Sequence, residues 1–531
     1  MNSSAHRLPS FRLVSLVAAA GAAIASSGAQ AQIFQRVVGS PDLERFHAID
    51  QTRDGGTIAA GVREVPGRGL EVYVVRFDAD GNTIWARTYG NAGRDVAHSI
   101  VTLPDGSFAV GCHTDAAGGA WQTGLLRLDP AGNPIAAWAY PGTAGTDTVN
   151  ASDPGVSIDL DAASASLILT GNFQGIPAFH RADALTGAPI ASVQHFFGLQ
   201  NHTVEVGYTD AAPDPLGSGD ALIGGSLRRT DNAGAVHEEP FFLRVNFVGM
   251  PVGPGIGYQL NPAAMQPWAG DGAAITTNGA SAFMTGRLEI PMGSADPALN
   301  IITLDLFGGL ISNFLIDTPG ADSIIPAYRA ADFRSGGGPL YAAGDVLNGN
   351  GARRAMQVSV SAPLAVDFLY AYDRDTGGRA IVAMENVCGQ TLAGVADPAS
   401  PPPGFGANDG YLVKTNKAGV SGCRESKPDF SPREYPIDRY PLNPDASPLP
   451  PAIEWPLTFT DIPTKNEAHC FNALCEPCLA DWNGDGVVNT IDVLGFLNDW
   501  AASDPEADVN GDGVVNTLDV IGFLNAWTSG C

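Results

Sequence analysis

The sequence predicts a mainly β protein that ends in a small all-α module. Short apolar runs that end in glycine recur seven times between Gly61 and Gly394, and successive glycines are 50, 60, 54, 61, 58 and 50 residues apart. Near the C-terminus, one loop-and-helix pattern occurs twice, 27 positions apart. The expected fold is therefore a seven-bladed β-propeller-like repeat domain, followed by two EF-hand-type calcium loops that each lead into one helix.

Residues 1–31 predict a secretory signal peptide. Arg7 and Arg12 precede an apolar run at 13–24, and Ala29-Gln30-Ala31 places small residues before a cleavage site. The apolar run is too short to span a membrane, and no later segment reaches 18 apolar residues. We therefore expect a secreted mature chain that begins near Gln32 and has no transmembrane segment.

The charge balance indicates which partners the chain does not seek. It has 56 acidic and 29 basic residues, for a formal net charge of −27. Such a chain repels nucleic acid and anionic lipid, whereas its carboxylates suit calcium-rich extracellular fluid. We expect no nucleic-acid partner and an extracellular or cell-envelope location.

Residues 32–427 carry the repeats that predict the propeller-like domain. Each apolar run is followed by strand, turn and strand, most clearly at 75–85 (Val-Arg-Phe-Asp-Ala-Asp-Gly-Asn-Thr-Ile-Trp) and 126–135, and more faintly at 243–249, 303–308 and 412–419. Asx/Gly turns between strands are typical of antiparallel hairpins. Four short strands per repeat favour a propeller over a β-solenoid or a pair of β-sandwiches. The first two units resemble secreted bacterial propeller repeats that read Asp-Gly-Gly, an apolar run, Gly, and then Asp-x-x-Gly-x-x-x-Trp.

Two further segments of the chain have simpler interpretations. Asp78, Asp80 and Asn82 resemble the start of a calcium loop, but they coincide with a predicted hairpin turn, and we interpret them as that turn. Residues 428–477 predict a stiff Pro-rich linker, because 428–463 hold ten prolines. Aromatic residues within it indicate that part of it lies against the repeat domain, which we expect to fold without the linker and the module.

The C-terminal repeats place oxygen ligands at the positions that Ca²⁺ requires. A twelve-residue loop supplies ligands from positions 1, 3, 5, 7, 9 and 12, and glycine at position 6 permits a sharp turn. Both copies fit this pattern, and they agree at 16 of 20 positions through the following helix. We expect two calcium ions. The ligands would be Asp481, Asn483, Asp485, the carbonyl of Val487, Asn489 and Asp492 in the first loop, and Asp508, Asn510, Asp512, the carbonyl of Val514, Asn516 and Asp519 in the second.

Each loop leads into one predicted amphipathic helix. Its apolar stripe comprises Val493, Phe496, Leu497 and Trp500 in the first copy, and Val520, Phe523, Leu524 and Trp527 in the second. With these features, residues 478–531 resemble a dockerin of the GC type, which ends secreted bacterial proteins in Gly-Cys. The resemblance implies docking to a cohesin-like or other cell-envelope protein. Dockerins often recognise cohesin through loop positions 10 and 11, which here are Thr490 and Ile491, then Thr517 and Leu518.

Seven cysteines lie in a chain that we expect to be secreted. We predict a disulfide between Cys478 and Cys531, which would join the two ends of the module. The weaker pairings Cys470–Cys475 and Cys388–Cys423 would leave Cys112 free. A zinc cluster of His469, Cys470, Cys475 and Cys478 is an alternative.

The sequence nominates no catalytic residue and no organic cofactor. His237-Glu-Glu-Pro240 begins like a metal motif but ends in proline, which favours a loop. His47 and His98 occupy equivalent places in the first two repeats, either as structural imidazoles or facing a shared ligand. The leading interpretation is a calcium-binding surface or scaffold protein whose propeller binds a carbohydrate or protein ligand. The alternative is a polysaccharide hydrolase or lyase; enzymatic activity is the less favoured of the two.

Overall fold

The computed structural model describes most of the chain from Gln32 onward. The described residues are 32–91, 93–115, 121–141, 155–173, 176–260, 269–270, 274–289, 298–317, 323–333, 339–347, 353–362, 365–372, 376–383, 389–396, 408–416, 418–422, 425–474, 479–480, 482, 490–502, 507–509 and 514–529. The expected signal peptide lies outside them. No helix within these ranges is both long and apolar enough to cross a bilayer.

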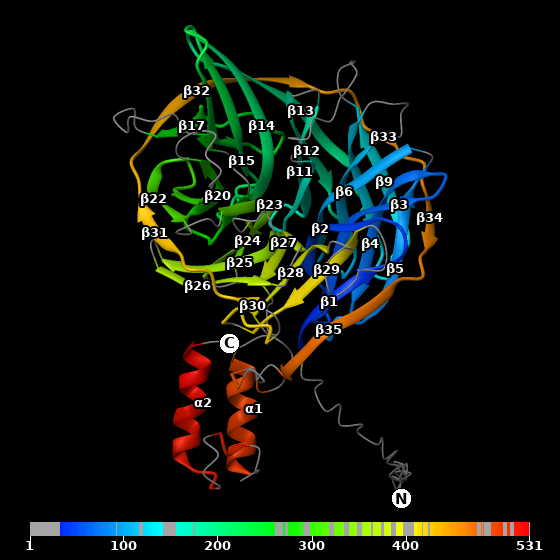
Figure 1. The fold of residues 1–531 in the computed structure, drawn as a ribbon, viewed down its shortest axis with the longest axis vertical. Helices are drawn as coiled ribbons and strands as arrows, with labels where there is room; N and C mark the ends of the chain where they lie inside the picture. The colour runs from blue at the N-terminus through cyan, green and yellow to red at the C-terminus, as the bar shows by residue number, and fades with distance from the viewer. Residues whose placement is uncertain are drawn as a thin grey trace, which may run out of the picture.

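Consecutive strands of the repeat domain pair antiparallel, and the described strands form seven groups (Figure 1). Group 1 contains β2 (Glu44–Gln51), β3 (Thr57–Val65), β4 (Gly69–Phe77) and β5 (Thr83–Gly90). Group 2 contains β6 (Gly93–Thr102), β7 (Phe108–Thr114), β8 (Gln122–Leu128) and β9 (Pro134–Tyr140). Group 3 contains β10 (Ser157–Asp161), β11 (Ser166–Phe173), β12 (Ile176–Asp183) and β13 (Pro189–Gly198). Group 4 contains β14 (His202–Pro213), β15 (Ala221–Asp231), β16 (Val236–Val245) and β17 (Gly255–Leu260).

The remaining groups continue the pattern and close it. Group 5 contains β19 (Ala274–Thr277), β20 (Ala282–Glu289), β21 (Ala298–Leu304) and β22 (Leu310–Asp317), and β18 (Ala269–Gly270) connects β16 with β20. Group 6 contains β23 (Ser323–Phe333), β24 (Leu340–Leu347), β25 (Arg353–Ala362) and β26 (Ala365–Tyr372). Group 7 contains β27 (Thr376–Ala383), β28 (Gln390–Ala396), β29 (Asp409–Lys414) and β1 (Gln32–Gly39) from the start of the described chain. All seven recurring glycines lie on the second strand of a group: Gly61, Gly111, Gly171, Gly225, Gly286, Gly344 and Gly394.

A hydrophobic cluster lies between each pair of neighbouring groups. Val72 and Val74 of group 1 pack with Val110 of group 2, for example. Corresponding clusters join groups 2 to 3, 3 to 4, 4 to 5, 5 to 6, and 6 to 7. Phe34 of group 7 then packs with Phe46 of group 1 and closes the ring. The sheets are therefore arranged around a common centre in a propeller-like fold (Figure 1).

The predicted hairpin turn after β4 is confirmed. Asp78 Oδ1 accepts the backbone N–H groups of Asp80 and Asn82 at 3.0 and 2.8 Å, and Gly81 has φ +75°. The Arg36 guanidinium donates to Asn82 Oδ1 at 3.1 Å. These hydrogen bonds stabilise the turn, so Asp78, Asp80 and Asn82 form the predicted hairpin turn and not the cation loop that their sequence resembles.

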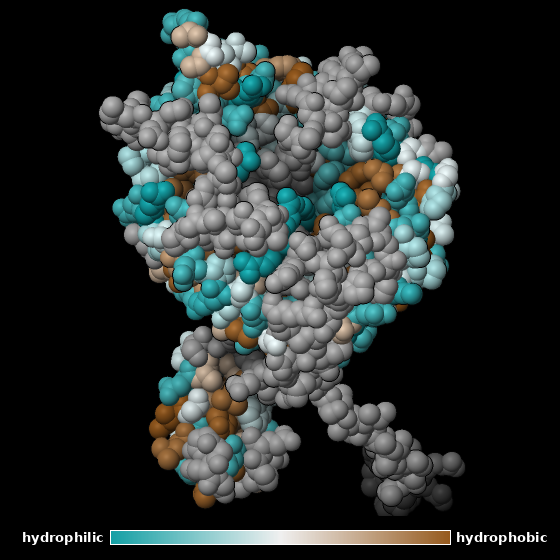
Figure 2. All heavy atoms as spheres, in the orientation of Figure 1, coloured by the Kyte–Doolittle hydropathy of each residue, from teal (hydrophilic) through white to brown (hydrophobic). Residues whose placement is uncertain are grey.

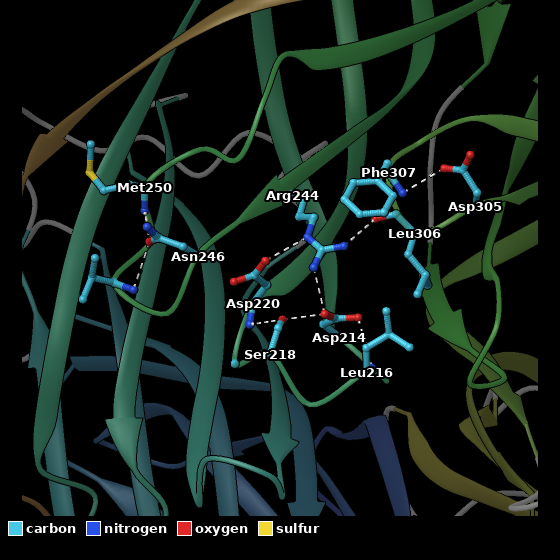
Figure 3. Close-up of polar contacts among 12 residues, drawn as sticks. Asp214, Leu216, Ser218, Asp220, Arg244, Asn246, Met250, Asp305, Leu306 and Phe307 are labelled. Carbon is cyan, nitrogen blue, oxygen red and sulfur yellow. Dashed lines mark hydrogen bonds and ion pairs between the residues drawn. The ribbon is translucent and has the colours of Figure 1, made fainter.

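Buried cations connect neighbouring groups at these turns, as Figure 3 shows for Arg244 of β16. Its Nη2 and Nε lie 2.8 and 2.9 Å from carboxylate oxygens of Asp214 and Asp220 in its own group. Its Nη1 donates to the Leu306 carbonyl of group 5 at 3.2 Å, and the Phe307 ring lies 4.5 Å from the guanidinium. Four equivalent cations also donate to a loop carbonyl of the following group: Arg76 to Pro130, Arg127 to Leu185, Arg181 to Gly219 and Lys414 to Ala79.

The segment predicted as a linker instead forms an outer belt, residues 425–474, around the ring (Figure 1). It runs antiparallel to the outer strand of every group, in the order 6, 5, 4, 3, 2, 1 and 7. The prediction of a spacer over 428–477 is therefore wrong for its described part. The belt strands are β30 (Glu425–Ser426), β31 (Ser431–Glu434), β32 (Ile437–Pro448), β33 (Ile453–Glu454), β34 (Thr458–Asp461) and β35 (Lys465–Leu474).

The prolines of the belt suit its place at the sheet edges. A proline lacks the N–H that a central strand needs, but an edge strand uses only one of its two sides for pairing. Apolar side chains anchor the belt, since Leu442 is fully buried and Trp455 is only 3% exposed. The backbone N–H of Trp455 also donates to the Ala137 carbonyl at 3.0 Å. The belt thus belongs to the core and also blunts the sheet edges against pairing with other chains.

The C-terminal module has the two expected helices, α1 (Thr490–Ala501) and α2 (Thr517–Ser529). Phe496 and Phe523, at equivalent positions of the two copies, are fully buried and stack with ring centroids 4.2 Å apart. Trp482 packs edge-on against both rings. Leu497 and Leu524, which we expected in the buried stripes, are 37% and 39% exposed. The aromatic pair therefore forms the centre of the small core, while the leucines lie at its margin.

Candidate functional site

The recurring glycines have a structural cause at the centre of the ring. In β2 and β14 the strand register shifts opposite Gly61 and Gly225. A Cβ on Gly61 would lie 1.8 Å from the Arg45 carbonyl oxygen, and one on Gly225 would lie 2.2 Å from that of Gly207. Only glycine fits such an approach, and a β-bulge redirects the side chain that it carries. Together with similar shifts in β6 and β27, the bulge residues are His47, His98, Thr209 and Arg379.

A cavity of about 140 Å³ lies where the first strands of all seven groups converge. Every group contributes one or more residues to the lining of this cavity. No single segment of the sequence could therefore predict it. Each first strand contributes at least one lining residue, for example Ile49 (β2), Ser99 (β6), Asp159 (β10), Asp210 (β14), Thr276 (β19), Asp332 (β23) and Ala380 (β27). We take this axial cavity as the candidate site.

The carboxylates of the cavity differ in their electrostatic environment. Burial raises the pKa of Asp159 to about 8, and the charges of Asp210, Asp50 and Asp332 act in the same direction. Asp210 accepts the Ser157 hydroxyl at 2.5 Å and the Ile275 backbone N–H at 3.0 Å. Asp210 therefore connects groups 3, 4 and 5, whereas Asp159 is protonated at neutral pH and can donate a hydrogen bond.

The structure brings the two predicted histidines together. The rings of His47 and His98 stack with centroids 5.6 Å apart and planes inclined by 19°. His47 Nδ1 lies 2.9 Å from the Ala97 carbonyl oxygen, so this nitrogen carries a proton. His98 also contacts the His113 ring at 4.9 Å and lines the cavity. The pair thus combines a structural contact between groups 1 and 2 with a place at the candidate site.

The described part of each predicted calcium loop contains a buried carboxylate in the first helical turn. Asp492 and Asp519 are both fully buried. Asp519 Oδ2 accepts the Asn516 N–H at 2.7 Å, while Asn516 Oδ1 accepts the Leu518 N–H at 2.8 Å. This arrangement is a variant of the capping box, in which the Asn516 side chain accepts from Leu518 instead of Asp519, and it orients the Asp519 carboxylate. Asp508 and the carbonyl of Val514, which accepts the Asn516 amide at 2.8 Å, are the other predicted ligands of the second loop that the structure describes.

The remaining predicted ligands lie outside the described residues: Asp481, Asn483, Asp485, Val487, Asn489, Asn510 and Asp512. Over the part of the chain that the structure describes, no group of three or more His, Cys, Asp or Glu side chains is placed to hold a metal ion. The described donors are all oxygen atoms, which fit the preference of calcium. The two calcium ions stay a prediction.

Two other sequence predictions have definite outcomes. His237-Glu-Glu-Pro240 lies within strand β16, paired with β15, so the loop prediction is wrong. Pro240 sits opposite Ser226 in the ladder. Cys112 is a buried free cysteine, as expected, and burial raises the pKa of its thiol. The predicted disulfides and the zinc alternative each involve at least one cysteine outside the described residues.

Sequence reasoning missed most of the axial site. Asp159 and Asp332 line the cavity, and Arg379 directly precedes the lining residue Ala380. All three belong to segments without a recognisable motif, and only the ring closure brings these segments together. The recurring glycine was the one available signal, because each lies on the strand next to a first strand and five of the seven pair directly with a first-strand residue. The spacing of these glycines correctly predicted a strand in each repeat. The β-bulge could not be predicted from it, because a bulge is defined only once the partner strand is known.

Comparisons with known proteins identify no family for this chain. No protein-family description matches it, and no curated protein matches it. Among solved structures, it is similar to the Dos1 propeller at 8% identity and TM-score 0.36, covering 73% of this chain and 95% of that one. It is also similar to the exotype rhamnogalacturonan lyase YesX at 12% identity and TM-score 0.35, covering 72% and 73%. The propeller domain of the Trilobed protease from Pyrococcus furiosus gives 10% identity and TM-score 0.29, covering 60% and 93%.

The raised pKa values predict a pH-dependent melting temperature. Burial raises the pKa of Asp159 to about 8 and of Glu44 to about 7, so the folded state keeps protons that the unfolded state releases. Stability then falls as pH rises from 6.5 to 8. His180 and His195, whose pKa values burial lowers to about 3 and about 4, act with the opposite sign mainly below pH 6.5, and their contribution fades by about pH 7.5. We expect the melting temperature to fall by about 2–4 °C over this window.

Differential scanning calorimetry at pH 6.5, 7.2 and 8 measures this fall. Asp159→Asn should flatten the profile, because asparagine carries no titrating proton. Glu205→Gln, at an exposed carboxylate, is the matched control and should keep the wild-type profile. A melting temperature that rises between pH 6.5 and 8 would contradict the assignment.

Proposed function

We propose that this chain is a secreted calcium-binding protein whose seven strand groups are the blades of a propeller that serves as a binding platform. The axial cavity is the observation that carries this proposal, because it collects polar side chains from separate groups at one place. A carbohydrate is the favoured ligand, since carboxylates and hydroxyls such as Asp210 and Thr276 suit hydrogen bonds to sugar hydroxyls.

Binding of sugars to the full chain tests the platform. We expect at least one monosaccharide or oligosaccharide to raise the melting temperature in a screen of neutral and acidic sugars, and Asp159→Asn to reduce that rise. Thr460→Val, on the belt far from the first strands, is the control and should behave as wild type. If no sugar or glycan in a broad screen changes the melting temperature, the platform for carbohydrates is refuted.

One observation favours a polysaccharide hydrolase or lyase as a second candidate. A carboxylic acid that stays protonated at pH 7 is suited to general-acid catalysis, and Asp159 has a pKa of about 8 beside Asp210. Release of reducing ends or of unsaturated products from plant and algal polysaccharides would identify this activity. Its loss in Asp159→Asn would assign the residue, whereas activity that survives this substitution would place catalysis elsewhere.

The helical module would anchor the protein to a cohesin-like or other cell-envelope partner, with calcium holding its two loops. Exposed apolar side chains on both helices support this proposal: Leu494 is 62% exposed, and Leu518 and Ile521 are 58% and 55% exposed. Figure 2 shows apolar atoms gathered on this module. Leu494 and Ile521 occupy equivalent positions in the two copies, so either helix can present a similar face.

Capture from envelope extract tests the docking role. We expect Leu494→Asp or Ile521→Asp alone to weaken capture of the partner only a few-fold, because the other helix remains, and the double variant to abolish it. Asn498→Asp, on an exposed position of α1, is a matched control for added charge. Unchanged capture by the double variant would make the module a calcium-stabilised cap instead.

A further inference from the structure

Two arginines on the first strands of groups 1 and 7, Arg45 and Arg379, carry more positive charge than the carboxylates paired with them neutralise. Arg379 Nη1 lies 3.2 Å from Asp345 Oδ2, but Arg353 Nη1 lies at the same distance from the same oxygen. Arg45 is half-buried, and its Nε is a buried nitrogen without a hydrogen-bond partner. Across the described ranges, no ion pair joins Arg45 to a carboxylate. Burial and the charge of Arg379 both lower the pKa of Arg45.

These arginines lie on the strands that line the axial cavity. Arg379 is the bulge residue of β27 and directly precedes Ala380, which lines the cavity. Arg45 lies on β2, three residues before the lining residue Ala48, which is about 10 Å along a strand. His47 lies between Arg45 and Ala48 on β2, and its ring stacks on that of His98. Groups 7, 1 and 2 therefore contribute a basic arc, defined as Arg379, Arg45, His47 and His98.

The acidic residues of the cavity come from other groups. Asp159, Asp210 and Asp332 belong to groups 3, 4 and 6. The carboxylates that line the cavity therefore come from groups 3, 4 and 6, whereas the basic arc comes from groups 7, 1 and 2. Within the arc, His98 lines the cavity itself, and Asp50 of β2 is a carboxylate on the same side. A ligand that complements both the basic arc and the lining carboxylates would carry a negative charge at one end and hydroxyl groups at the other.

We propose that the basic arc binds the oxyanion of an acidic sugar, a carboxylate or a sulfate ester, with Arg45 and Arg379 as its direct partners. A half-buried guanidinium without a counter-charge is costly, and its planar donors match the two oxygens of a carboxylate. The sugar hydroxyls would then face Asp159 and Asp210. The inference rests on the proposed binding platform and specifies the ligand class of that same cavity.

Calorimetric titration of the full chain with galacturonate, galactose 6-sulfate and galactose tests the inference. We expect an anionic sugar to bind at least about tenfold more tightly than galactose, and Arg45→Gln to remove most of that advantage. Arg45→Lys should keep part of it, because it retains the charge without the planar fork. Arg228→Gln removes an equivalent charge at an exposed site on group 4 and should bind as wild type. Comparison of the carboxylate with the sulfate shows which oxyanion the arc prefers.

The outcomes separate this inference from the binding platform. If galactose binds as tightly as both anionic sugars, or if folded Arg45→Gln binds them as wild type does, the oxyanion site is refuted while the platform stands. If none of the sugars in the wider screen binds, the carbohydrate platform fails with it. Circular dichroism checks that each variant is folded. If Arg45→Gln does not fold, two other measurements test the oxyanion site. The wild type should prefer anionic sugars, and Arg45→Lys should reduce that preference.

Discussion

A chain that ends at Lys427 will lose the cooperative unfolding of the ring. The outer belt adds a strand to every group and buries Leu442 and Trp455. Burying two such side chains contributes roughly 3–6 kcal/mol, against a total stability of about 5–15 kcal/mol for a domain. We therefore expect aggregation or a broad, low-temperature transition in calorimetry, which reverses the expectation from sequence that the repeat domain folds alone.

Two controls locate the cause in the belt. A chain that ends at Leu474 keeps the belt without the helices, so it should melt cooperatively and ignore calcium chelators. Trp455→Ala in the full chain should lower the melting temperature by roughly 5–10 °C, because it leaves a cavity in the core between groups 1 and 2. Ile453→Ala, two residues earlier on the belt but 42% exposed, should change it little. Cooperative melting of the chain that ends at Lys427 would show that the belt is dispensable.

Removing calcium will unfold the helical module while the ring stays folded. Asp492 and Asp519 are fully buried, and the sequence gathers further carboxylates in each loop. Without a cation these charges repel one another in a small core built on Phe496 and Phe523. We expect titration of the chelated full chain to give two calcium ions per chain. Tryptophan emission should shift towards red on chelation, because Trp482 lies in that core.

Single substitutions should remove one ion at a time. Asp492→Asn is expected to leave one calcium ion per chain, as is Asp519→Asn, and the double variant none. Glu205→Gln, at an exposed carboxylate of group 4, is the control and should keep both. A stoichiometry near zero for the wild type, or a tryptophan spectrum that chelation does not change, would leave the capping box as the whole role of Asp519.

Local features of the sequence predicted local features of the fold. The glycine runs marked the second strand of each group, and Asp78 with Gly81 marked a hairpin turn, because both depend on nearby backbone geometry. The two helices followed from periodicity. The belt could not be recognised in this way, since prolines that suit an exposed linker equally suit an edge strand. Its contacts lie hundreds of residues away, as between Asn466 and Arg36, which are separated by 430 positions.

The axial site depends on the same long-range closure. Asp159 and Arg379 lie on strands that meet around one cavity only because seven groups complete a circle, and no spacing in the sequence encodes that distance. The sequence shows that both residues are charged, but it does not show that their strands lie close together. By contrast, the stacked His47 and His98 were recognised because duplication of a repeat puts equivalent residues on neighbouring strands.

The position of β1 has a kinetic consequence. This first strand pairs with β29 on one side and with β35 on the other, and its Gln35 hydrogen bonds to Tyr411, 376 positions later. The ring therefore cannot close until nearly the whole repeat domain has emerged, and the belt can finish only afterwards. Contacts of such high sequence separation slow folding and prolong the exposure of unpaired edges. We expect refolding from denaturant to be slow and concentration-sensitive, with β1 and β35 the last strands to gain protection from hydrogen exchange.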